Sequence, residues 1–128
     1  MIWRLGEAEA IRLLVSSQVL DEIEGALRRK ALDMLGLLAL LLDRSRVEVV
    51  PSPAAQTVRH SQALTGHPGD GRVLAAAWAA GVEYLVTLDR KHFLGNPTLE
   101  GAVPFPVGTP GDFLAWYRER LVRAGREH

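Results

Sequence analysis

The segment Tyr84-Leu-Val-Thr-Leu-Asp89 decides the fold class, because its residues are mostly apolar in succession. Such a run predicts a parallel strand that is buried on both faces. An alanine-rich stretch, Arg72–Ala80, precedes it and predicts a helix that Gly81 ends as a C-terminal glycine. The turn 67–71 lies before this helix, and Asp70 stands where its N-cap is expected. A helix that leads directly into a buried strand is typical of an α/β protein.

The flanking sequence continues the alternation of strands and helices. Ser16 and Ser17 can cap a helix over Ser17–Lys30, and its last turn carries Arg28, Arg29 and Lys30 beside the negative end of the helix dipole. The other predicted elements are strands at Ile11–Ser16, Val47–Pro51 and Val103–Val107, and helices at Asp33–Arg44, Ala54–Gly66 and Gly111–Arg123. This order predicts one α/β domain over residues 1–128, with a mainly parallel sheet and right-handed crossovers.

Composition and charge exclude several classes of protein. The 128 residues include no cysteine, which excludes zinc ribbons, thiol catalysis and a disulfide framework. The formal net charge of zero argues against a surface that is basic throughout. The N-terminus is broken by charge before an export signal can form, and the longest apolar run, Leu35–Leu42, is far shorter than the roughly 20 residues of a membrane span. We therefore expect a cytoplasmic protein without a membrane segment.

The predicted helix Asp33–Arg44 is unusual because it is apolar nearly all round from Leu35 to Leu42. A helix of this kind is either deeply buried or covered by a partner. In a small protein, such an excess of leucine indicates oligomerisation, and we predict a homodimer.

Three acidic residues are candidates for one site. Asp89 ends a predicted strand, Asp70 opens the helix that leads into this strand, and Glu22 lies early in the helix after Ile11–Ser16. Ligands of open parallel sheets bind outside the carboxyl ends of the strands. Carboxylates gathered without histidine or cysteine favour Mg²⁺ or Mn²⁺, which can activate water and neutralise charge on a phosphoryl group. Each residue also has a structural interpretation, since Asp70 can be an N-cap and Glu22 can stabilise a helix dipole.

Four short motifs, in order, resemble the PIN-domain family. They are Ser16-Ser-Gln-Val-Leu-Asp-Glu22, His67-Pro-Gly-Asp70-Gly-Arg-Val-Leu-Ala-Ala-Ala77, Val86-Thr-Leu-Asp89 and Thr109-Pro-Gly-Asp-Phe-Leu114. The resemblance implies a three-layer α/β/α sandwich and a Mg²⁺- or Mn²⁺-dependent endoribonuclease, in bacteria most often the toxin of a toxin–antitoxin pair. It further implies that Glu22, Asp70 and Asp89 bind the metal, that the Thr87 hydroxyl assists, and that RNA and an antitoxin protein are partners. Asp21 projects about 100° away from Glu22 around the helix, so we do not expect it at the site.

The sequence departs from the family pattern in two places. Family members open with a central strand that ends in a metal-binding Asp, but no Asp precedes Asp21 here. We expect that this first central strand is missing and that the native start lies upstream of Met1 or the chain is a truncation. His67 stands where many relatives have a further acid, and we expect a loop histidine there. The alternative function is therefore a catalytically impaired PIN-like module that binds a partner and cleaves nothing.

Overall fold

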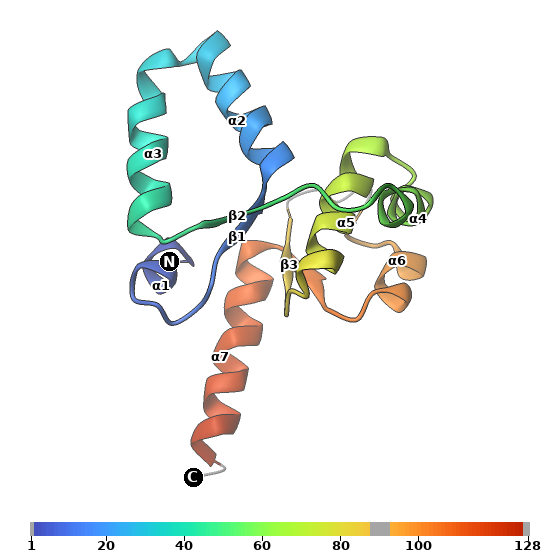
Figure 1. Ribbon diagram of the computed structural model, residues 1–128. Coiled ribbons are helices and arrows are strands. Elements are labelled where there is room, and N and C mark those ends of the chain that lie inside the picture. The colour runs from blue at the N-terminus through green and yellow to red at the C-terminus, as the bar shows by residue number, and fades with distance from the viewer. Residues whose placement is uncertain (1, 88–92, 127–128) are drawn as a thin grey trace.

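The computed structural model describes residues 2–87 and 93–126 as a mixed α/β structure (Figure 1). In chain order its elements are α1 (Ile2–Glu7), β1 (Leu14–Ser16), α2 (Ser17–Lys30), the 3₁₀ turn η1 (Leu32–Met34), α3 (Leu35–Arg44), β2 (Glu48–Val50), α4 (Ala55–Thr65), α5 (Pro68–Ala80), β3 (Leu85–Val86), α6 (Pro97–Ala102), β4 (Val107–Gly108) and α7 (Pro110–Arg126). None of the helices in these residues combines the length and the apolar character that crossing a bilayer requires.

The strands pair in parallel, as predicted, but in residues 2–87 and 93–126 they form two separate sheets and not one. Strand β1 pairs with β2, and Val15 lies opposite Val49. Strand β3 pairs with β4, and Leu85 lies opposite Val107. The predicted strand Tyr84–Asp89 is described as β3 over Leu85–Val86, and its last two residues lie outside the described segments.

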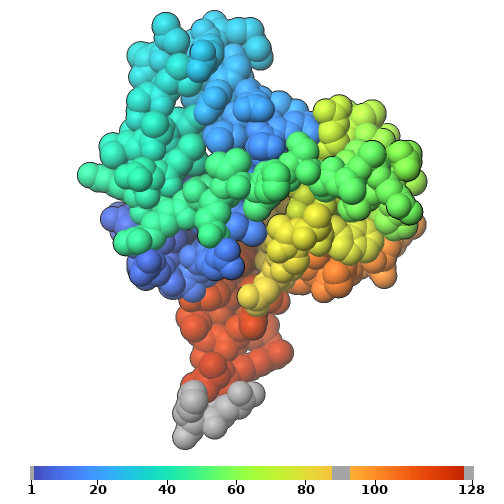
Figure 2. All heavy atoms as spheres, in the orientation of Figure 1, coloured from blue at the N-terminus to red at the C-terminus, as the bar shows by residue number. Residues whose placement is uncertain are grey.

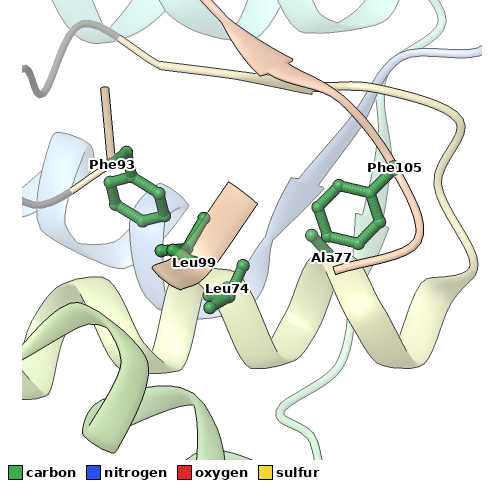
Figure 3. Packing of buried hydrophobic residues seen from close by; sticks show 5 residues of the cluster. All are labelled: Leu74, Ala77, Phe93, Leu99 and Phe105. Carbon is green, nitrogen blue, oxygen red and sulfur yellow. The ribbon is translucent and has the colours of Figure 1, made fainter. Parts of the chain in front are cut away.

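The hydrophobic core lies around α5, between α6 and the β3–β4 sheet. Its buried side chains come from α5, from α6 and from the segments on either side of α6 (Figure 3), and they are Leu74, Ala77, Phe93, Leu99 and Phe105. Leu85 of β3 and Val107 of β4 pack against this cluster. Helix α5 also contacts β1, so the same helix lies against both sheets.

Residues 2–50 contrast with this core. They form α1, β1, the helical hairpin of α2, η1 and α3, and β2, and the hairpin stands away from the rest of the chain in Figure 1. In this range only Gly6 and Ser45 are buried. The prediction left open whether the leucine-rich helix is deeply buried or covered by a partner, and no residue of α3 is buried within the chain.

Local signals explain where α2 and α5 begin and end. Ser16 is the N-cap of α2, and its hydroxyl accepts a hydrogen bond of 3.1 Å from the backbone N–H of Val19. The three basic residues lie in the last turn of α2, as predicted. Gly81 ends α5 in the left-handed conformation at φ 66°, which glycine adopts without steric cost.

The predicted start of α5 is wrong. The helix begins at Pro68, so Asp70 lies inside the first turn, and the N-cap is His67. Pro68 occupies a first-turn position, where the missing N–H of proline removes no helical hydrogen bond. His67 is thus the cap of a helix and not a residue of an irregular loop.

The region around Val103–Val107 also differs from the prediction. The strand there is shortened to Val107–Gly108, because Pro104 and Pro106 cannot donate to a ladder. The sequence before it forms α6, which was not predicted. The side chain of Asn96 caps α6 by accepting a hydrogen bond of 3.1 Å from the N–H of Leu99.

Helix α7 begins against the body of the molecule and ends outside it. Its first turns contribute the buried Phe113, which packs edge-on against Tyr84 with ring centroids 5.3 Å apart. Residues 118–125 are all exposed, and Figure 2 shows this end of the helix standing clear of the other elements.

Candidate functional site

Glu22 lies in the second turn of α2, the helix that directly follows β1. Its carboxylate is exposed and accepts a hydrogen bond of 3.0 Å from Nε2 of Gln18, one helical turn earlier. Asp21 is exposed as well. Glu22 is therefore accessible to a ligand. Its hydrogen-bond partner, Gln18, is itself a long and flexible side chain.

Asp70 has a more restricted environment than Glu22. It lies in the first turn of α5, and its side chain is 21% exposed, whereas that of His67 is 51% exposed. Nδ1 of His67 accepts a hydrogen bond of 3.3 Å from the backbone N–H of Asp70 and lies 3.4 Å from the carboxylate Oδ2. The carboxylate is thus fixed at the N-terminal end of α5, where the helix dipole favours negative charge.

Thr87 follows β3 directly, at the carboxyl end of the strand. Its backbone N–H donates a hydrogen bond of 2.9 Å to the carbonyl of Gly108 and so extends the pairing of β3 with β4. Asp89 and His92 lie outside the described residues.

Asp112 belongs to the same end of the sheet, and it was not among the predicted site residues. Its Oδ2 accepts a hydrogen bond of 2.9 Å from the N–H of Thr109, and Oγ1 of Thr109 accepts one of 3.1 Å from the N–H of Asp112. This reciprocal pair at the start of α7 is a capping box, with Asp in place of the usual Glu. The spacing Thr-x-x-Asp in the sequence was the signal that could have identified it.

Gly108 packs closely against Tyr84 and Asp112. A Cβ atom at Gly108 would overlap the Tyr84 hydroxyl and would lie 2.8 Å from Cβ of Asp112. Burial raises the pKa of the Tyr84 hydroxyl above its ordinary value of 10.0, and the negative charge of Asp112 raises it further. An open hollow of about 500 Å³ adjoins Asp112 and is also lined by Leu94, Gly95 and Thr109.

The structure brings some of these residues together and describes two of the three predicted acids. Thr87, Gly108 and Asp112 meet at the carboxyl end of the β3–β4 sheet. Glu22 lies on α2 and Asp70 on α5, and both helices contact β1. The described residues contain no group of three or more His, Cys, Asp or Glu side chains that could hold a metal ion, but Asp89 is not among them.

The comparisons with known proteins give no family. No family model, no curated protein and no solved structure matches this chain. The function is therefore inferred from the residues of the chain, its parallel strands and the contacts between them.

Proposed function

We propose that this chain is a metal-dependent endoribonuclease of the PIN type, and the toxin component of a toxin–antitoxin pair. The observation that supports the proposal is the order of acidic residues and parallel strands along the chain. Glu22 lies on the helix that follows β1, and Asp89 comes three residues after the end of β3. Asp70 lies in the first turn of α5, the helix that leads into β3. Sites of parallel α/β sheets form at these strand ends.

Glu22, Asp70 and Asp89 would hold Mg²⁺ or Mn²⁺ in this proposal. Their donor atoms fit these cations, which prefer carboxylate oxygens. The bound metal would supply activation of a water molecule and neutralisation of charge on the phosphodiester. The Thr87 hydroxyl would orient a carboxylate by a hydrogen bond. Asp70, with most of its side chain covered, is held more firmly than Glu22 and would fix the geometry.

The division of the strands into two sheets also fits the resemblance to the PIN family. The family's three-layer sandwich has its first strand in the middle of the sheet, and the described residues of this chain form two separate parallel pairs, β1–β2 and β3–β4. In this proposal, the absence of the central strand would account for the two parallel pairs that the chain forms in place of one mainly parallel sheet.

RNA cleavage by the purified chain tests the proposal. We expect it to cut single-stranded RNA with Mn²⁺ or Mg²⁺, to stop when EDTA is added, and to lose activity in Asp89→Asn and Asp70→Asn. Asn keeps the size of each side chain but removes its charge. Asp21→Asn is the matched control, because Asp21 is exposed beside Glu22 and is not placed at the site. Full activity in Asp89→Asn would contradict the site assignment.

The division into two sheets also favours a second candidate function, a catalytically impaired PIN-like module. A protein that lacks the first-strand Asp retains three carboxylates at most and binds a cation less tightly. In this case the chain folds and binds an antitoxin or another copy but cleaves no RNA. Calorimetry distinguishes the two, because the enzyme requires Mn²⁺ binding that Asp70→Asn weakens. Absence of Mn²⁺ binding near millimolar concentration would favour the impaired module.

A further inference from the structure

Helix α2 carries a basic side chain on the same face as Glu22. Arg29 follows Glu22 after two turns of the helix, and at about 100° per residue the two positions differ by only about 20° around its axis. At 1.5 Å per residue they are about 10 Å apart along this axis. Both side chains are exposed, and Gly25 between them has none. This face therefore presents a carboxylate and a guanidinium with an open position between them.

The guanidinium of Arg29 is directed back along α2 toward Glu22. Its Nη1 lies 3.4 Å from the position that a Cβ atom of Gly25 would occupy, so the group lies over the helix turn that precedes Arg29. The free carbonyls of the helix, with the negative end of its dipole, are in the opposite direction, beyond the last turn. Contact with these carbonyls therefore does not explain where the guanidinium lies.

The Arg29 guanidinium also has no acidic partner among residues 2–87 and 93–126. Four other arginines form ion pairs with glutamates, and they are Arg12, Arg46, Arg120 and Arg123. Arg29 forms none with any residue of these segments. The planar guanidinium can donate two parallel hydrogen bonds to one phosphate group. Arg29 is thus accessible, positively charged and suited to a phosphate.

We propose that Arg29 binds a backbone phosphate of the RNA substrate, so that the strand runs along α2 from Glu22 toward the C-terminal end of the helix. This inference rests on the proposed function, in which Glu22 binds the metal beside the phosphodiester that is cleaved. RNA carries one phosphate for each nucleotide, so a strand held at Glu22 would bring a neighbouring phosphate past Gly25 to Arg29. A phosphate contact carries no base information, so Arg29 would position the strand without selecting its sequence.

RNA binding in the absence of metal tests this contact separately from cleavage. Fluorescence anisotropy of a labelled single-stranded RNA in EDTA should give a dissociation constant about tenfold larger for Arg29→Gln than for the wild type, because one charge-assisted contact is lost. The slope of log K against log salt should become less steep by about 0.7, the share of one phosphate contact on a single strand. Arg29→Lys should keep this slope but recover only part of the affinity, since lysine retains the charge without the fork of donors.

Arg28→Gln is the matched control for Arg29→Gln. Arg28 is exposed in the same helix turn, and its substitution removes the same charge, but its face of α2 carries Asp21 and Glu24. This variant should change the dissociation constant by less than about twofold, because salt screens an exposed charge that touches no phosphate. Glutamine is a good helix former, so circular dichroism should show unchanged helix content in both variants.

Cleavage kinetics with Mn²⁺ complete the test. Arg29→Gln should raise KM about tenfold and leave kcat unchanged, because a contact remote from the cleaved bond is equally strong in the ground and transition states. RNA binding that Arg29→Gln leaves unchanged, or that Arg28→Gln weakens as much, would overturn the inference even where the wild type cleaves RNA. RNA binding that depends on Arg29 without any cleavage would support the contact and contradict the nuclease.

Discussion

Residues 2–50 and residues 55–126 use similar apolar side chains in different ways. The second region buries Leu74, Leu99, Phe93 and Phe105 in one cluster around α5. The first region has many leucines and valines, yet it buries only Gly6 and Ser45. A core forms where helices and strands from distant parts of the chain converge, and the hairpin of α2, η1 and α3 lacks such convergence. Apolar composition therefore does not by itself specify a core.

The exposed apolar side chains show the same contrast. Of the large hydrophobic residues that are exposed, most lie in residues 2–50, and they are Trp3, Ile23, Leu32, Met34, Leu37, Leu40 and Val49. Contiguous exposed apolar surface marks sites of interaction. The first region thus leaves many of its large apolar side chains exposed, whereas the second buries its own in a core.

The largest effect that would distinguish the two regions is the loss of a core leucine. Leu74 is fully buried, so Leu74→Ala should lower the free energy of unfolding by about 2–5 kcal/mol through lost burial and a new cavity. Leu32 is 66% exposed, and Leu32→Ala should change it by no more than about 0.5 kcal/mol. Urea unfolding followed by circular dichroism measures both. Equal losses in the two variants would remove the contrast between the regions.

Replacing one glycine of each region by alanine should give a smaller difference in the free energy of unfolding. A Cβ atom at Gly71 would lie 2.6 Å from Cα of Gln62, so Gly71→Ala should force α4 and α5 apart and cost about 1–3 kcal/mol. At Gly36 in α3 no atom lies within 4 Å of the added Cβ. Gly36→Ala should therefore be neutral or should stabilise the helix by up to about 1 kcal/mol. Thermal unfolding of both variants tests this, and a destabilising Gly36→Ala would show that α3 is covered within the chain.

The smallest expected effect is a dependence of the free energy of unfolding on alkaline pH, which comes from Tyr84 in the second region. Because the folded state raises the pKa of Tyr84, the stability that this residue contributes is fully present below pH 10 and is lost as pH rises through the folded value. Tyr84→Phe should make the fall in unfolding free energy with pH less steep above pH 10. Denaturation at a series of alkaline pH values measures the slope. An unchanged slope in Tyr84→Phe would show that other groups cause it.

Local sequence signals predicted the helices better than they predicted the sheet. The bounds of α2 and the end of α5 were correct, because Ser16, the basic last turn and Gly81 act within a single turn of helix. The start of α5 was misplaced, although Pro68 after His67 is a local signal for a helix start. The separation into two sheets depends on contacts between distant segments, and no short stretch of sequence encodes it.

The candidate site was predictable only in part, for the same reason. Glu22, Asp70 and Thr87 lie on the elements that the sequence indicated, or next to them. The environment of Asp70 was not foreseen, because it depends on His67 acting as a cap. The position of Asp112 beside Gly108 and Tyr84 requires the pairing of β3 with β4, which brings the start of α7 to the end of β3.

The proposed site joins the two regions, since Glu22 belongs to the first and Asp70 and Asp89 to the second. The most direct test is Mn²⁺-dependent cleavage of single-stranded RNA by the wild-type chain and by Glu22→Gln, measured under identical conditions. We predict cleavage by the wild type and its loss in Glu22→Gln, which keeps the side-chain length but removes the charge. Cleavage that persists in Glu22→Gln, or no cleavage by the wild type, would contradict a metal site shared by the two regions.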